Sequence, residues 1–165
     1  MKITVSENAG FCPGVRRADE AVQRLIANRS ENELIYTLGH LIHNRIYNED
    51  LMKKGVISVT LSELTAILEK ETDKKITLII RTHGITKEAS ETLNEYLRSH
   101  KNLSVLDMTR PYVKKIHKIA EENTNDETYF VLFGSKTHPE SQGIISYAKG
   151  SIPDHTGTDM SEIEV

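Results

Sequence analysis

Ile76-Thr-Leu-Ile-Ile80 is the stretch of sequence that decides the fold class. It is almost continuously apolar, as a strand is when both faces of its sheet are covered by other elements. His83-Gly84 follow it closely, and an apolar pattern with helical spacing begins after Thr86, whose hydroxyl can cap a helix N-terminus. A buried strand that leads through a short polar turn into a helix is typical of parallel α/β sheets.

The same order of strand and helix continues on both sides of this stretch. Apolar or β-branched runs predict further strands at residues 3–5, 34–38, 56–59, 103–106 and 129–133. Helical periodicity predicts helices at residues 15–28, 44–53, 62–69, 86–97, 111–120 and 139–148. We therefore expect an α/β fold of two successive three-layer units with mainly parallel sheets. The first unit is predicted over residues 1–108, an incomplete second unit over 109–150, and a tail over 151–165.

Composition narrows the class of protein. The net charge of −3 argues against a nucleic-acid-binding surface. No apolar run approaches the roughly 20 residues that a membrane-spanning helix needs, and the first residues lack the pattern of a signal peptide. The chain has a single cysteine, Cys12, so that an intrachain disulfide is excluded. We expect a soluble, cytoplasmic protein with neither a membrane nor a nucleic acid as partner.

Polar residues gather at the points where predicted strands end and helices begin. These positions hold Cys12, His40, His43, Asn44, His83, Arg110, His138 and Glu140. Ligands of parallel α/β sheets bind beyond the carboxyl ends of the strands, where helix N-termini also direct N–H groups at anions. The pattern predicts that these side chains face one cleft that binds an anion such as a small-molecule diphosphate.

Simpler interpretations of the same residues remain open at this point. A histidine in a loop is commonly solvated or structural, and a lone cysteine is commonly buried and inert. Gly10 and Gly14 beside Cys12 favour a close backbone approach, and the helix after it favours a thiolate. Glu140 beside His138 fits either a proton-transfer pair or a solvated helix start.

Five motifs together resemble the 4-hydroxy-3-methylbut-2-enyl diphosphate reductase family (LytB/IspH). They occur in the family's order and at its spacing over nearly the whole chain. They are Ala9-Gly-Phe-Cys-Pro-Gly-Val15, Gly39-His-Leu-Ile-His-Asn44, Arg81-Thr-His-Gly84, Asp107-Met-Thr-Arg-Pro-Tyr-Val-Lys-Lys-Ile-His117 and His138-Pro-Glu140.

The resemblance implies a reductive dehydroxylation that gives isopentenyl and dimethylallyl diphosphate in the methylerythritol phosphate pathway of isoprenoid synthesis. The family uses a 4Fe–4S cluster held by three cysteines, one in each of three α/β units, and takes electrons from a ferredoxin or flavodoxin. Cys12 matches the first cluster ligand, and Glu140 matches the acid that relays protons. Three residues, His43, His83 and His138, match the histidines that surround the substrate diphosphate.

The sequence departs from the family at the cluster. Arg110 stands where the family has its second cysteine, and an arginine supplies a permanent positive charge in place of a thiolate. The third unit and its cysteine are also missing from these residues. Because a cluster needs several thiolates, we expect that Cys12 alone does not hold one, and that Arg110 favours a bound anion.

Three functional hypotheses follow from this departure. The chain is a truncated or degenerate member of the reductase family, or a non-redox module that binds a diphosphate or similar anion. The third hypothesis is a different enzyme in which Cys12 is a nucleophile beside the histidines. Loss of the third unit also predicts an exposed apolar surface that the unit would cover.

Overall fold

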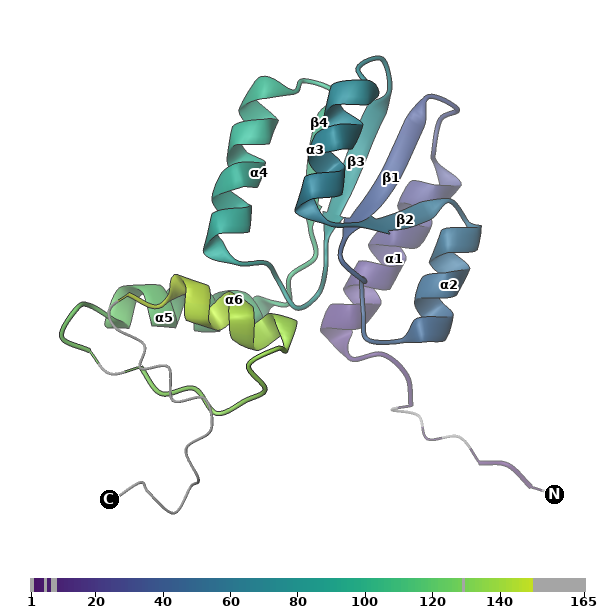
Figure 1. Cartoon of the computed structure of the whole chain (residues 1–165). Helices are drawn as coiled ribbons and strands as arrows, with labels where there is room; N and C mark the ends of the chain where they lie inside the picture. The colour runs from purple at the N-terminus through teal and green to yellow at the C-terminus, as the bar shows by residue number, and fades with distance from the viewer. Residues whose placement is uncertain (1, 5, 7–8, 129, 150–165) are drawn as a thin grey trace.

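A four-stranded parallel sheet forms the centre of the molecule (Figure 1). The computed structural model describes residues 2–4, 6, 9–128 and 130–149. The strands are β1 (Glu33–Leu38), β2 (Val56–Val59), β3 (Lys75–Ile80) and β4 (Leu103–Asp107), in the order β2-β1-β3-β4. The helices are α1 (Pro13–Ala27), α2 (Arg45–Lys53), α3 (Leu61–Lys70), α4 (Lys87–Ser99), α5 (Pro111–Asn123) and α6 (Pro139–Tyr147). The predicted α/β fold with a parallel sheet is confirmed.

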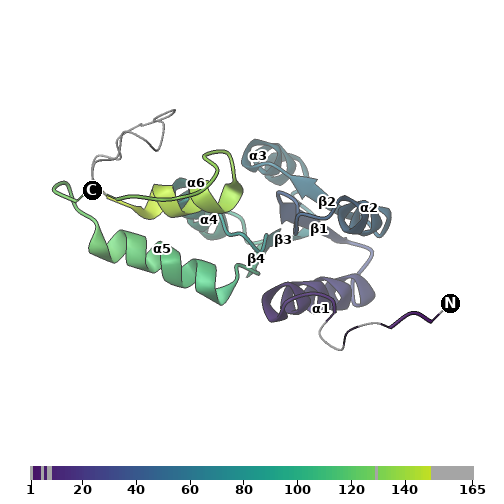
Figure 2. The same ribbon diagram turned by 90° about the horizontal axis from the view of Figure 1, so that it is seen from below.

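Helices cover both faces of the sheet, as the apolar run in β3 predicted (Figure 2). Leu78 packs with the side chains of α3 and α4 in one core, and Ile79 packs with α1 and α2 in the other. Both side chains are fully buried. Because successive residues of a strand point to opposite faces, a strand covered on both sides must be apolar at nearly every position.

Local signals set several helix ends where the sequence predicted them. The backbone of Gly55 has φ +81°, and the hydroxyl of Thr86 accepts a hydrogen bond from the N–H of Ala89 at the start of α4. A left-handed residue ends a helix at little cost when it is glycine. In the part of the chain that the structure describes, no helix is long and apolar enough to cross a membrane.

The remaining two helices lie beyond the carboxyl end of the sheet. α5 and α6 pack side by side there, and the views in Figures 1 and 2 agree on this arrangement. The turns that follow β1 and β3 meet these helices. This end of the sheet is therefore the place where the polar residues singled out in the sequence come together.

Two predicted strands are not formed. The prediction for residues 129–133 was wrong for 130–133, which pair with no strand among the described residues, and Tyr129 lies outside them. An isolated strand leaves its backbone groups unpaired, and Val131 and Phe133 are 71% and 76% exposed. The prediction of a strand at residues 3–5 was wrong for residues 3 and 4, which also pair with no strand among the described residues. Residue 5 lies outside the described residues. The predicted tail also lies outside it, and the division into units at 108/109 stays a prediction.

Candidate anion-binding site

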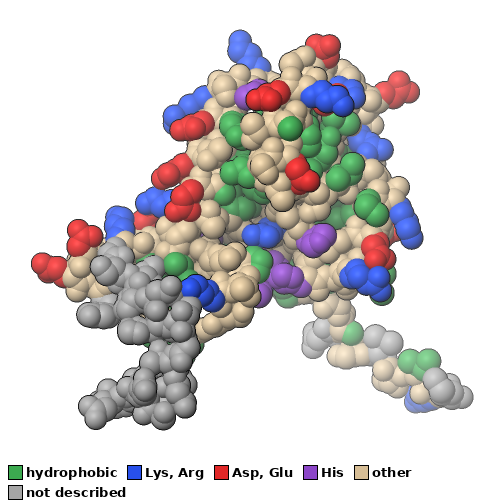
Figure 3. Space-filling view, viewed as in Figure 1, with side chains coloured by type: hydrophobic (Ala, Val, Ile, Leu, Met, Phe, Trp, Pro, Cys, Tyr) green, Lys and Arg blue, Asp and Glu red, His purple; other side chains and the backbone are tan. Residues whose placement is uncertain are grey.

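Three histidines from three separate junctions form the centre of the site. His43 lies in the turn between β1 and α2, His83 follows β3, and His138 is the N-cap of α6. The ring centroid of His43 is 4.3 Å from that of His83 and 5.1 Å from that of His138, and the last two are 5.6 Å apart. Figure 3 shows histidine side chains gathered below the sheet, beside positively charged groups.

The turns that carry His43 and His83 are joined by hydrogen bonds. The backbone N–H and the hydroxyl of Thr82 both donate to the carbonyl oxygen of Leu41, at 3.2 and 3.0 Å. A Cβ atom on Gly39 would come within 2.7 Å of Nη1 of Arg81, and Gly39 has φ +71°. Glycine at this position therefore permits both the left-handed turn and the close approach of the arginine.

His138 is held in a defined orientation by the helix that it caps. Its Nδ1 accepts a hydrogen bond from the backbone N–H of Glu140 at 3.2 Å. A neutral imidazole that accepts at Nδ1 carries its proton on Nε2. The free edge of His138 is then a hydrogen-bond donor, at the N-terminus of a helix, where an anion is favoured.

The pKa values of the other two histidines are lowered, which favours their neutral forms. Burial lowers the pKa of His83 to about 4, and the neighbouring His43 and Arg110 act in the same direction. Burial also lowers the pKa of His43, followed by the effect of His138. Nδ1 of His83 is buried and has no hydrogen-bond partner among the described residues. An anion between the rings would raise the pKa values of both histidines, because its negative charge would stabilise the protonated forms.

The histidine cluster could in principle take a transition metal instead of an anion. Ring nitrogens of His43, His83 and His138 lie within 4.8 Å of one another, and three imidazoles are a common ligand set for zinc. Two observations favour an anion. His138 presents Nε2–H instead of a lone pair, and Arg81 and Arg110 act on His83 as positive charges. Both would oppose a cation and attract an anion.

Arg110 joins the starts of three helices at the edge of the cluster. It is the N-cap of α5, and its Nη2 donates to Oε2 of Glu140 in the first turn of α6 at 2.5 Å. A Cβ atom on Gly14 would lie 2.9 Å from Cγ of Arg110, so the arginine side chain packs on the first turn of α1. Cys12, the N-cap of that helix, is exposed.

The predicted site residues therefore form two adjacent groups. One group is His43, His83 and His138, and the other is Arg110 with Glu140, next to the helix that Cys12 caps. The three histidines lie together at the carboxyl end of the sheet, whereas a single cleft shared with Cys12, Arg110 and Glu140, and the roles of these residues, stay predictions. Arg81 was missed, although it follows the strongest strand directly. Its Nε donates to the carbonyl oxygen of Gly84 at 3.1 Å, and its charge acts on His43 and His83.

The residues of this chain do not fit a 4Fe–4S cluster. Cys12 is the one cysteine in the sequence, and such clusters are held by several thiolates. The side chain at the second cysteine position is a guanidinium, which already makes an ion pair with Glu140. A positive group next to the cluster position cannot coordinate iron and would repel it.

Fold and site together define a parallel α/β protein with a cluster of histidines at the carboxyl end of its sheet. Comparison with known sequences specifies the family. The family model described as "LytB protein" matches residues 3–162, and the chain belongs to that family.

Individual relatives share a name that states a reaction. A protein of Campylobacter hominis named 4-hydroxy-3-methylbut-2-enyl diphosphate reductase is 40% identical over 164 residues, which are 99% of this chain and 52% of the relative. A protein of the same name from Caldanaerobacter subterraneus subsp. tengcongensis is 38% identical over 144 residues, 87% of this chain and 46% of the relative. The chain therefore spans about half the length of the curated relatives that it matches.

Solved structures give the same result for the fold. A structure described as (E)-4-hydroxy-3-methyl-but-2-enyl diphosphate reductase, the terminal enzyme of the non-mevalonate pathway, has a TM-score of 0.65 and 35% identity. The match covers 93% of this chain and 51% of that one. The structure of the Plasmodium falciparum reductase has a TM-score of 0.67 and 28% identity, over 86% of this chain and 40% of that one.

Proposed function

We propose that this chain is a diphosphate-binding member of the LytB family that does not hold a 4Fe–4S cluster by itself. One observation carries the proposal. Three histidine rings converge at a helix N-terminus, whereas the position of a second cluster ligand is occupied by Arg110 in an ion pair with Glu140. The ligand that we propose is an allylic diphosphate, the class of compound named in the relatives' reaction.

Each side chain has a separate part in binding. His138 donates from Nε2 to a phosphate oxygen while its Nδ1 caps α6. His43 and His83, whose pKa values are lowered in the free protein, gain affinity for protons as the anion enters, because the bound charge raises both pKa values again. Arg81 adds a positive charge next to the rings. Binding is therefore coupled to proton uptake near and below neutral pH.

The reductive dehydroxylation that the relatives' name implies would need cysteines that this chain does not supply. A ferredoxin or flavodoxin would be the electron donor only in an assembly that contains the cluster. In such an assembly Glu140 would have to leave Arg110 before it could contact the substrate, because Oε2 of its carboxylate is paired with Nη2 of Arg110.

Titration calorimetry with inorganic diphosphate tests the proposal on the iron-free protein. We expect saturable binding by the wild type and a loss of at least tenfold in affinity for His43→Ala and His83→Gln. His100→Gln is a matched control, because His100 caps the far end of α4 and contacts Tyr96. Absence of binding by the wild type, or equal affinities in all four proteins, would overturn the proposal.

A further inference from the structure

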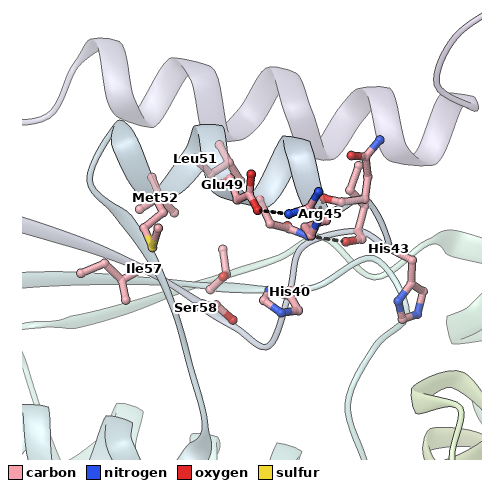
Figure 4. Close-up of a pocket in the computed structure, with 13 residues that line it drawn as sticks. His40, His43, Arg45, Glu49, Leu51, Met52, Ile57 and Ser58 are labelled. Carbon is pink, nitrogen blue, oxygen red and sulfur yellow. Dashed lines mark hydrogen bonds and ion pairs between the residues drawn. The ribbon is translucent and has the colours of Figure 1, made fainter.

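An apolar groove adjoins the histidine cluster on the side of α2 (Figure 4). It is a cavity of about 610 Å³ between α2 and the edge strand β2, and such a volume is ordinary for a small-molecule site. Its walls include Ile42, Leu51, Met52, Val56 and Ile57. Figure 4 shows Met52 and Ile57 close together at one end, with His40 and His43 toward the other.

His43 belongs to both the groove and the anion site. It lines the cavity, and its ring is 4.3 Å from His83. A diphosphate at the histidines would therefore lie at the mouth of the groove. Imidazole rings beside the positive charge of Arg81 at one end, and hydrocarbon along the walls, are complementary to a ligand with an anionic head and an apolar tail.

The side of the histidines toward Arg110 is less favourable for an apolar tail. There the side chain of Arg110 packs on Gly14 and pairs with Glu140, so that the space toward Cys12 holds a charged pair. Burial of hydrocarbon against this partly buried pair would remove water from the charges without replacing it. The groove also has an ion pair, Arg45 with Glu49, but these side chains are 84% and 46% exposed and keep their contact with water. The groove under α2 is consequently the favourable direction for the tail.

The length of the groove sets a lower limit on the tail that would fill it. Arg45 and Met52 both line it and are seven residues apart on α2, which corresponds to about 10 Å along the helix axis at about 1.5 Å per residue. A five-carbon chain reaches at most about 6 Å, because each carbon–carbon bond is about 1.5 Å long. A single five-carbon unit would leave the end at Met52 and Ile57 empty.

We infer that the ligand is a prenyl diphosphate with more than one five-carbon unit, whose tail lies in the groove between α2 and β2. The inference rests on the proposed function, since it assigns the diphosphate to the histidines. It adds a chain-length preference that is determined by Met52 and Ile57.

The test compares the affinities of inorganic, dimethylallyl, geranyl and farnesyl diphosphate by titration calorimetry, each below its micelle concentration. We expect farnesyl diphosphate to bind at least tenfold more tightly than dimethylallyl diphosphate. The double variant Met52→Gln with Ile57→Thr should lose most of this gain and keep its affinity for inorganic diphosphate. Both positions are partly exposed, at 60% and 49%, so the polar side chains are compatible with the fold.

Two controls separate the possible explanations. Ile46→Gln alters an apolar residue of α2 that is 73% exposed and is not among the residues that line the groove, and it should leave every affinity unchanged. Farnesol, which lacks the diphosphate, should bind far more weakly than farnesyl diphosphate. Equal affinities for all tail lengths, a gain that persists in the double variant, or tight binding of farnesol would overturn the inference. In these cases retained binding of inorganic diphosphate would leave the proposed function standing, whereas its absence in the wild type would overturn both.

Discussion

Nη2 of Arg110 and Oε2 of Glu140 are 2.5 Å apart, in an ion pair that connects the first turns of α5 and α6. Both side chains are partly buried, with 30% and 26% exposure. The pair occupies the region where the LytB family resemblance predicts a cluster ligand next to a proton-relay acid. It follows that Nη2 of Arg110 is engaged by Glu140, whereas its buried Nε has no hydrogen-bond partner among the described residues.

Replacement of Glu140 by Gln should therefore strengthen diphosphate binding. The change removes a negative charge near the site and frees the guanidinium to reach the anion. We expect a gain of about 1 kcal/mol, or roughly fivefold in affinity, as for a partly solvated charge pair. Calorimetry with inorganic diphosphate measures it, and Glu121→Gln, which loses a pair with Lys87 on the other side of α5, is the control. Weaker binding by Glu140→Gln would mean that Glu140 itself contacts the ligand.

The lowered pKa of His83 makes stability depend on pH. The folded protein has a pKa of about 4 at this residue, compared with an ordinary value of 6.5, so the unfolded chain binds more protons between these values. The stabilisation is fully present above pH 6.5 and is lost as the pH falls through 4. Between pH 7 and 4.5 the wild type should lose about 2 kcal/mol more of its free energy of unfolding than His83→Gln. Urea denaturation of both proteins at the two pH values measures this difference, and equal losses would contradict it.

The two roles of His138 can be separated by two substitutions. His138→Ala removes the cap of α6 and should cost about 1 kcal/mol of stability, whereas His138→Asn keeps a capping oxygen and should cost only a few tenths. Both remove the Nε2–H donor, so both should reduce diphosphate affinity about tenfold. Thermal unfolding and calorimetry on the same samples report the two effects. If the Asn variant binds as well as the wild type, His138 has a capping role alone.

An exposed apolar stripe on α5 predicts self-association. Tyr112, Ile116 and Ile119 are 82%, 39% and 48% exposed and lie on one face of the helix at i, i+4 and i+7. Contiguous exposed apolar residues of this kind are typical of a surface that contacts another protein. Sedimentation velocity should show a concentration-dependent increase in mass, which Ile116→Gln with Ile119→Gln suppresses. Leu97→Gln on α4, at a position 40% exposed, should not suppress it. A wild type that is monomeric at every concentration would contradict the prediction.

The sequence predicted those features that depend on local pattern. The apolar run at β3 indicated a strand covered on both faces, and the positions of His43 and His83 after strands indicated one shared end of the sheet. His138 lies at the same end, although the strand predicted before it is not formed in its described residues. Residues 130–133 have the composition of a strand as well, but a strand also requires a neighbour, which composition cannot supply.

Two features of the site depend on side-chain packing and could not be predicted. The pairing of Arg110 with Glu140 joins residues 30 positions apart and depends on the angle between α5 and α6. The groove beside His43 exists because α2 does not fill the space against the edge strand β2, and no motif encodes an unfilled volume.

The iron content after anaerobic reconstitution with iron and sulfide tests the central claim most directly. The purified chain should retain far less iron than one 4Fe–4S cluster per molecule and should lack the cluster's broad visible absorption, because Cys12 is its one thiolate. Arg110→Cys should give the same result, since two thiolates are still fewer than the family's three. A stoichiometric cluster in the wild-type chain would contradict the account and would mean that ligands other than cysteine hold the iron.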